Sequence, residues 1–264
     1  QEPALIRALI LAAVLLAGFA ERAAGQWSVA AFGGNVSTAK EDLRVTSAGD
    51  DVAVTLRDVP YDDQSSRSPV YYGGRLTRFF ESVPWLGLEV EFIHLKIITA
   101  PHTEVAVDGR LVGQSLPESL PLGMVLPRFE LSHGLNLLLG NVVVRLPLGP
   151  RRQPSPTPRV GFTLRGGAGP AVPHVEVSFR GRDEDGYRLG RIAWHAAAGI
   201  DMRLWKRLHG VSEVKWTISR QHLQAAGAQI DGTFRSRHIV AGLSWSLSPA
   251  ASDRHRPFMR DASF

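Results

Sequence analysis

The stretch from Val70 to Phe92, VYYGGRLTRFFESVPWLGLEVEF, holds two runs of alternating residues on either side of the short segment SVPW. The proline in that segment cannot continue a strand, so we expect a tight turn there. In a hairpin closed by this turn, Arg75 faces Glu91 and Thr77 faces Glu89. Opposite charges on neighbouring strands contribute about 0.2–1 kcal/mol per pair. The stretch therefore predicts an antiparallel hairpin with charged residues on one face.

The same alternation, which is the period of a strand, recurs through the chain after Gln26. Eight segments carry it: 27–38, 69–81, 86–98, 128–146, 159–179, 191–204, 211–220 and 236–247. Long polar connections, above all 39–68 and 99–127, alternate with short turns. Outer-membrane barrels are built in this way, with the N-terminus and the short turns on the periplasmic side.

The bulky residues of each segment share one face. In the last segment Ile239, Leu243 and Trp245 alternate with Gly242 and Ser244. A barrel of eight strands has room inside only for side chains, so the bulky face is expected outside. In the opposite arrangement each Arg or Lys would meet lipid at a cost of roughly 2–4 kcal/mol. The sequence therefore predicts an all-β fold, an eight-stranded antiparallel up-and-down transmembrane β-barrel over residues 26–247.

The two ends of the chain differ from this pattern. Arg7 precedes an apolar run of 13 residues and the small residues Ala23 and Gly25 follow it, which is typical of a signal peptide over residues 1–25 cleaved before Gln26. A spanning helix would need about 20 apolar residues. Residues 248–264 are predicted to be a periplasmic tail. Localisation in a bacterial outer membrane follows from both features.

Composition excludes several classes of function. The 264 residues include no cysteine, which removes disulfides and thiolate chemistry. The net charge of +5 comes from scattered basic residues rather than a run, so nucleic acid is not an expected partner. An anionic lipid surface, such as lipopolysaccharide, fits better.

Charged residues of the inner face are predicted to plug the lumen with ion pairs. A second turn, in 205–210, would place Arg203 opposite Glu213 and Asp201 opposite Lys215. The predicted network comprises Arg75, Glu89, Glu91, Glu130, Arg165, Asp201, Arg203, Glu213 and Lys215. A half-dry lumen makes an unpaired member of such a network costly.

His94 and Lys96 fall on the lipid side when Glu89 and Glu91 point inward. They lie about a full transmembrane strand above the turn, where the cost of a charge falls to about 0–1 kcal/mol. Contact of Lys96 with a lipid phosphate at the outer rim is one expectation. The alternative is a β-bulge that turns both residues inward.

The run Val70 to Arg75 with Phe79 and Phe80, the run Leu86 to Phe92, and the run Arg237 to Trp245 resemble strands two, three and eight of the OmpA-like small outer-membrane β-barrel family. The resemblance covers residues 26–247. It implies the fold, assembly by the barrel-assembly machinery, and a role among structural anchors, adhesins and barrels of no assigned role. The tail from Ser248 departs from the family, because the assembly signal usually ends the chain. Either 245–247 or Phe264 carries that signal.

No catalytic residue, metal site or cofactor is predicted. Ser132 and His133 are neighbours on a strand and should point to opposite faces, Ser132 into the lumen with Glu130 and Asn136, and His133 toward lipid. The spacing of His94, His102 and Glu104 matches no metal signature.

The leading hypothesis is therefore a non-enzymatic barrel that acts as a structural, surface-binding or adhesion protein through residues 39–68 and 99–127. Loops carried on a rigid scaffold are the usual place for such contacts. The expected partners are outer-membrane lipid, the assembly machinery and an extracellular ligand of these loops. A lipid A-modifying hydrolase or acyltransferase is the alternative. A narrow channel ranks third, because paired charges should occlude the bore.

Overall fold

A computed structural model describes residues 25–148 and 159–247. The predicted signal peptide, apart from Gly25, and the predicted tail 248–264 lie outside the described residues. Among the described residues, no helix is long and apolar enough to cross a membrane.

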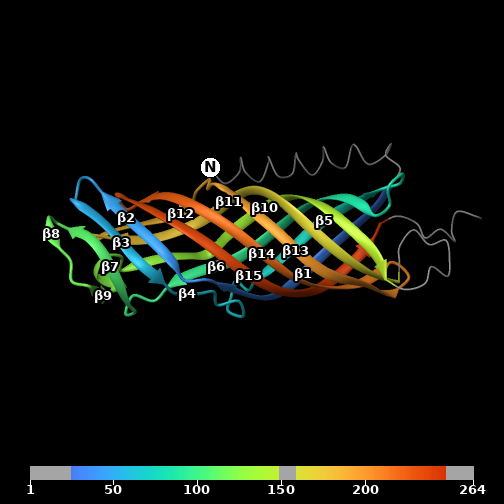
Figure 1. Cartoon of the computed structure of the whole chain (residues 1–264), viewed down its shortest axis with the longest axis horizontal. Helices are drawn as coiled ribbons and strands as arrows, with labels where there is room; N and C mark the ends of the chain where they lie inside the picture. Colours follow the sequence, from blue (N-terminus) through green and yellow to red (C-terminus); the bar gives the residue numbers. More distant parts are fainter. Residues whose placement is uncertain (1–24, 149–158, 248–264) are drawn as a thin grey trace, which may run out of the picture.

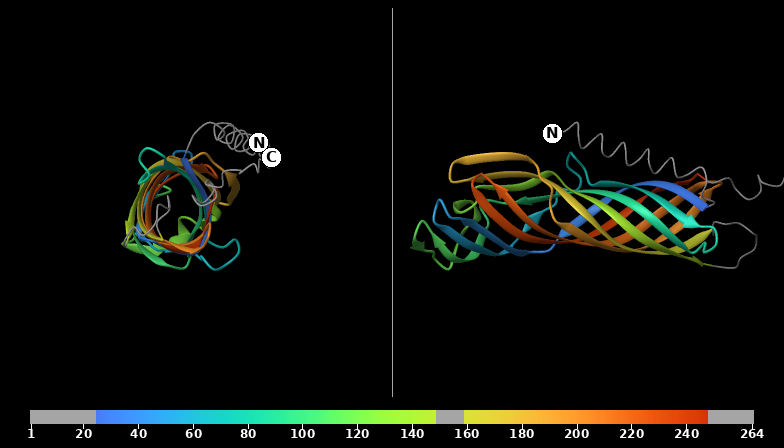
Figure 2. Two further views of the ribbon diagram at one scale, coloured as in Figure 1. Left: turned by 90° about the vertical axis from the view of Figure 1, so that its right-hand side faces the viewer. Right: turned by 90° about the horizontal axis from the view of Figure 1, so that it is seen from above.

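Eight long antiparallel strands close into a barrel in the order in which they follow along the chain (Figure 1). They are β1 (Gly25–Thr38), β5 (Tyr72–Phe80), β6 (Leu86–Thr99), β10 (Arg128–Leu148), β11 (Val160–Phe179), β13 (Ile192–Trp205), β14 (Leu208–Ala225) and β15 (Ala228–Ser246). Pairing of β1 with β15 completes the ring, which Figure 2 shows end-on. The predicted eight-stranded up-and-down barrel is confirmed.

The register of the two tight hairpins was predicted correctly in one case only. Arg75 lies opposite Glu91, and Thr77 opposite Glu89, as expected. The second register is wrong, because Asp201 lies opposite Val211 and Arg203 opposite His209.

The cause of this error is the length of the turn. β13 continues to Trp205 and β14 begins at Leu208, so only Lys206 and Arg207 join them. This shorter turn, together with a bulge between Arg203 and Trp205, shifts the pairing. Glu213 consequently lies opposite Gly199, and Lys215 opposite Ala197.

Apolar side chains cover the outside of the barrel near the short turns. The exposed ones include Val29, Leu88, Val90, Val142, Leu146, Leu164, Trp194, Ile200, Met202, Trp216, Ile218, Ile239, Leu243 and Trp245. Such a band far exceeds the exposed apolar patches of soluble proteins. Its height also fits a bilayer, because Leu138–Leu148 and Ile239–Leu247 are 11 and 9 residues long, against about 9–11 for a tilted transmembrane strand.

The chemistry of the two faces inverts further along the same strands. On β6 the outward Leu88, Val90 and Phe92 are followed by His94 and Lys96. The inward Glu89 and Glu91 are followed by Ile93, Leu95 and Ile97, which are fully buried. We call the part with the apolar exterior the lower barrel, and the part beyond Phe92, Leu138 and Ile239 the upper barrel. The upper barrel has the apolar interior of a protein surrounded by water.

Strands that were not expected from the sequence enlarge the upper barrel. They are β2 (Glu41–Ser47), β3 (Val52–Val59), β4 (Tyr61–Asp62), β7 (Glu104–Leu111), β8 (Gln114–Ser115), β9 (Ser119–Pro121) and β12 (Arg182–Tyr187), with one short 3-10 helix, η2 (Leu122–Met124). The sheet continues from β15 through β2, β3 and β7 to β8. We call β2, β3, β7, β8 and β9 the extension, which forms the end of the molecule opposite the short turns (Figure 1).

The extension shares one hydrophobic core with the barrel strands. Its inward side chains pack with those of β6, β10, β11 and β15. The fully buried members include Leu43, Val45, Val54, Leu56, Ile93, Leu95, Ile97, Phe129, Leu131, Phe179 and Ile230. Each buried side chain of this size contributes about 1.5–3 kcal/mol relative to exposure. Residues 39–68 and 99–127 are therefore part of a folded unit rather than flexible loops.

The lipid-facing band can be tested by placing a charge in it. We expect Leu243→Arg to lower the free energy of unfolding by about 2–4 kcal/mol, because the new guanidinium must leave water for lipid. Gln224→Arg, at an exposed outward position of the upper barrel, is the matched control and should change it by less than about 0.5 kcal/mol. The measurement is urea unfolding of the protein folded into phosphatidylcholine vesicles. Equal effects of the two substitutions would contradict the assigned band.

Candidate functional site: the closed lumen and the surface of the upper barrel

Three acids and three bases meet in the lumen of the lower barrel. They are Glu89, Glu91, Glu213, Arg75, Arg165 and Lys215, and none is more than 9% exposed. The alternation of β5, β6, β11 and β14 directs all six inward. Since the charges are equal in number, the cluster carries no net charge.

Glu213 lies at the centre of this cluster. Arg75 donates to both of its carboxylate oxygens, from Nη1 and Nη2, each at 2.7 Å. Arg165 Nη1 lies 2.6 Å from Glu213 Oε1, and Lys215 Nζ lies 2.9 Å from Oε2. Lys215 also contacts Glu91. One carboxylate thus joins all three cations of the cluster.

Neutral side chains satisfy the other two carboxylates. Thr77 Oγ1 donates to Glu89 at 2.6 Å. Asn141 Nδ2 donates to Glu89 at 3.1 Å and to Glu91 at 2.9 Å. His195 Nδ1 in turn lies 3.1 Å from Asn141 Oδ1. Hydrogen bonds of this kind are what make a buried ion pair tolerable.

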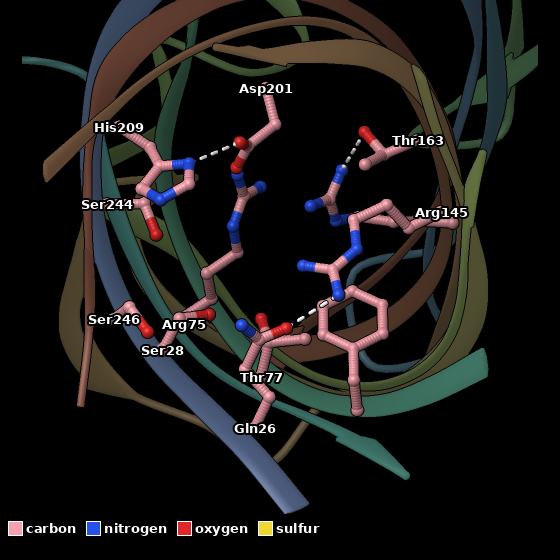
Figure 3. A pocket seen from close by; sticks show the side chains of 12 residues that line it. Gln26, Ser28, Arg75, Thr77, Arg145, Thr163, Asp201, His209, Ser244 and Ser246 are labelled. Atoms are coloured by element: carbon pink, nitrogen blue, oxygen red, sulfur yellow. Dashed lines mark hydrogen bonds and ion pairs between the residues drawn. The ribbon is translucent and has the colours of Figure 1, made fainter. Parts of the chain in front are cut away.

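A small cavity separates the charge cluster from the short-turn end (Figure 3). Arg145 Nη2 donates to Gln26 Oε1 at 2.6 Å, and its guanidinium lies 3.8 Å from the ring centre of Phe79. His209 Nδ1 lies 2.6 Å from Asp201 Oδ1 on the opposite side. The volume is about 20 Å³, which is room for about one water molecule. The lower lumen is therefore filled by side chains.

His238 forms the upper boundary of the polar lumen. Its Nε2 lies 2.9 Å from Thr217 Oγ1, and its Nδ1 lies 3.0 Å from the hydroxyl of Tyr71. Tyr71 also belongs to the apolar core of the upper barrel. The bore is therefore occupied mainly by polar side chains below this residue and mainly by apolar ones above it.

The structure brings together six of the nine residues predicted for the network, those of the charge cluster. Asp201 instead pairs with His209, and Arg203 is half-buried near the short-turn end. The placement of Glu130 in the lumen is wrong. Glu130 points outward, 3.3 Å from Arg128, because Phe129 and Leu131 occupy the inward positions at that height.

Five lumen residues were not predicted as members of the network: Asn141, Arg145, His195, His209 and His238. Four of them lie on a predicted strand in the frame that points inward, and that frame is the signal by which they could have been found. His209 falls in the predicted turn over 205–210, which the structure replaces with the start of β14.

His94 and Lys96 point outward, but the expected lipid contact is wrong. Each is only 4% exposed. The ring of His94 stacks on Tyr72 with centroids 4.9 Å apart, and Lys96 Nζ donates to the carbonyl of Arg67 at 2.9 Å. The connection before β5 therefore covers Lys96. The alternative, a bulge in β6 that turns both residues inward, is also not what the structure shows.

The bulge lies in β10, where the pairing with β11 and β6 shifts between Leu131 and Leu135. Because of this bulge, both side chains lie on the outer surface, and the predicted placement of Ser132 in the lumen is wrong. Ser132 Oγ lies 3.3 Å from His133 Nδ1, and both residues contact Glu176 on the outer surface.

This grouping is not a catalytic relay. In a Ser-His-acid relay the acid and the serine use different nitrogens of the histidine. Here His133 Nδ1 faces both Ser132 and Glu176, at 3.3 and 2.8 Å. Burial raises the pKa of the Glu176 carboxyl, but hydrogen bonds from Ser132 and His133 outweigh it, so the pKa lies below its usual range. The carboxylate is held as an anion.

The turn between β7 and β8 forms the far end of the extension (Figure 1). Val112 in this turn has a φ of +53° and is 47% exposed. A β-branched residue in this conformation is a strong outlier. By contrast, the neighbouring surface of the sheet carries paired charges. Arg57 forms ion pairs with Asp42 at 2.6 Å and with Asp108 at 2.7 Å.

The ring, its apolar exterior and its filled lumen define a transmembrane β-barrel. No protein-family model matches the sequence, and no curated protein matches it. Neisserial surface protein A (NspA) matches in structure over 83% of this chain and 96% of its own, with 10% identity and a TM-score of 0.37. Ail, the attachment invasion locus protein of Yersinia pestis, solved with the heparin analogue sucrose octasulfate, matches over 82% and 97%, with 10% identity and a TM-score of 0.29.

The charge cluster predicts a specific pattern of stability. Lys215→Met leaves Glu91 and Glu213 short of a cation in a dry lumen, so the free energy of unfolding should fall by about 3–5 kcal/mol. Adding Glu91→Gln restores equal numbers of acids and bases and should recover most of the loss. Arg57→Met, which breaks two exposed ion pairs, is the control and should leave stability nearly unchanged. Urea unfolding in vesicles measures all three, and a double variant no better than Lys215→Met would argue against the balanced cluster.

The same residues should keep the bore closed. We expect single-channel recordings of the wild-type protein in planar bilayers to show conductance near zero. Glu91→Ala and Lys215→Ala each remove a long side chain and unbalance the rest, so conductance should rise. Large wild-type conductance would contradict a plugged lumen.

Proposed function

We propose that the chain is a bacterial outer-membrane β-barrel that holds a folded binding surface outside the cell, where it serves a structural or adhesive role. The observation that carries this proposal is the inversion of the two faces between Phe92 and Ile93. Lipid would surround the lower barrel, and water the upper barrel. Since the lumen is filled in both the lower and the upper barrel, the outer surface of the upper barrel is the part available to contact a partner.

Export and assembly complete the proposal. The signal peptide over residues 1–25 would deliver the chain to the periplasm and the barrel-assembly machinery, leaving residues 248–264 as a periplasmic tail. Lipopolysaccharide would surround the finished barrel. Arg220, Arg235 and Arg237 are exposed beside Ile218 and Ile239, at the upper edge of the apolar band. Their charges suit lipid phosphates at that height.

We assign partner contact to the hairpin of β7 and β8, which we call the distal hairpin. Val112 places an exposed apolar side chain at the end of an otherwise charged surface, in a strained conformation. Backbone strain of this kind costs about 1–3 kcal/mol and is concentrated at functional positions. A residue that fitted the turn better, such as Asn or Gly, would be expected if folding alone selected it.

Cysteine labelling tests the orientation. The chain has no cysteine, so an introduced one is unique. Val112→Cys should react with a membrane-impermeant maleimide on intact cells. Lys206→Cys, in the short turn, should react only after the outer membrane is permeabilised. The reverse order of labelling would overturn the proposed topology.

A second experiment tests the binding surface. Val112→Asn relieves the strained turn and removes the apolar side chain, so stability should rise slightly while attachment of cells to surfaces coated with matrix proteins or glycans should fall at least several-fold. Gln224→Asn, at an exposed position of β14 outside the extension, is the control and should attach as the wild type does. Unchanged attachment by Val112→Asn cells, with equal surface display, would refute the assignment.

A further inference from the structure

We propose that His133, His174 and Glu176 bind one divalent transition-metal ion, of the class of Zn²⁺, on the outer surface of the upper barrel. Their potential ligand atoms all lie within 4.8 Å of one another. The site is separate from the charged lumen and from the distal hairpin, and the inference does not rest on the proposed function.

The distances fit a metal with little movement. Glu176 Oε1 lies 2.8 Å from His133 Nδ1 and 3.6 Å from His174 Nδ1. Bonds of about 2.0–2.1 Å to a tetrahedral zinc ion put neighbouring ligand atoms about 3.3 Å apart. The two distances lie on either side of that value.

An unsatisfied nitrogen points to a missing ligand. His174 Nδ1 is buried and has no hydrogen-bond partner. Buried polar atoms almost always have one, so each exception asks for an explanation. The ring is also held in place, with its centroid 4.6 Å from that of Tyr187 and 4.9 Å from that of His133. A metal ion bound to His174 Nδ1 would satisfy this atom without moving the ring.

The backbone is shaped to bring the three residues together. His174 and Glu176 are two apart on β11 and so share a face. His133 joins them only because of the bulge in β10. Gly134 in the bulge has a φ of +110°, and a Cβ there would lie 2.3 Å from His94 Nδ1. Only glycine fits this position, which fixes the direction of the preceding histidine.

The surrounding charges orient the carboxylate and still favour a cation. Arg128 contacts Glu176 through its other oxygen, Oε2, which leaves Oε1 to the histidines and Ser132. Glu130 lies 3.3 Å from Arg128 and offsets its charge. Glu176 and Glu130 together carry two negative charges and Arg128 carries one positive charge, so the site has one net negative charge. Groups that hold a ligand in this way commonly tune metal affinity.

The ligand types select the metal. Two imidazoles and one carboxylate suit Zn²⁺, Cu²⁺ and Ni²⁺ better than Mg²⁺ or Ca²⁺, which prefer oxygen ligands. Three protein ligands leave a fourth position of a tetrahedral ion open. The His133 side chain is 63% exposed, so that position faces the solvent. It is therefore available to water or to a donor group of a bound partner.

Equilibrium dialysis of the folded barrel in detergent against Zn²⁺ tests the site. We expect the wild type to bind one ion per chain, and Co²⁺ in its place to give the visible absorption of a tetrahedral complex. His133→Gln and His174→Gln should each weaken binding by more than the 10–100-fold typical of residues that only support a ligand. His222→Gln, which removes a surface histidine paired with Asp231 elsewhere, is the control and should bind as the wild type does.

Heat-modifiable gel mobility confirms that each variant is folded before it is compared. His133→Gln should disturb folding less than His174→Gln, because the His133 side chain is largely exposed. Absence of stoichiometric Zn²⁺ binding by the folded wild type would overturn the proposal. So would equal weakening of binding by the His222 control, since ordinary surface histidines would then account for the signal.

Discussion

The bore of an eight-stranded barrel has to be filled, and the way it is filled shapes the rest of this protein. A ring of this size is wide enough to need side chains inside and too narrow for an aqueous channel. Below His238 the filling is mainly the charge cluster around Glu213, and above it mainly the apolar core. The change from mostly polar to mostly apolar filling falls near His238 and Tyr71, and Phe32 of the core packs against Arg75 and Lys215 of the cluster.

The environment outside the barrel explains why the filling changes. Where lipid covers the wall, bulky apolar residues are placed outside, and the inward positions are left to polar residues. Opposite charges can occupy them because each acid has a basic partner, and Glu89 and Glu91 also accept hydrogen bonds from neutral side chains such as Asn141. Where water covers the wall, the same strands follow the rule of soluble proteins. The interior must then be apolar, and residues 39–68 and 99–127 supply much of the side-chain volume that the eight strands lack.

The sequence predicted the ring, the faces of the lower barrel and the first hairpin, because alternation and a proline-containing turn are local signals. It did not reveal the extension, although Val52, Val54 and Leu56 alternate there as clearly as in the barrel. Those residues stand in a polar context that suggests loops. The register of β13 and β14 depended on the turn length, and a two-residue turn is not distinguishable from a longer one by alternation alone. The metal-ligand group could not be predicted, because a bulge breaks the alternation from which the positions were inferred.

A folded extension changes how recognition at the surface would work. Flexible loops lose conformational entropy when they bind, and this opposes affinity. Strand β2 is hydrogen-bonded to β15 of the barrel wall, and β3 and β7 continue the same sheet. All three strands share the core of the barrel, so their outward residues are already ordered. A partner would meet a preorganised sheet of paired charges ending in an apolar turn. The same rigidity holds His133 beside His174 and Glu176, since both strands of that site are continuous with the membrane-spanning wall. The rigid β-structure that fills the upper bore therefore also fixes the surface that faces the solvent.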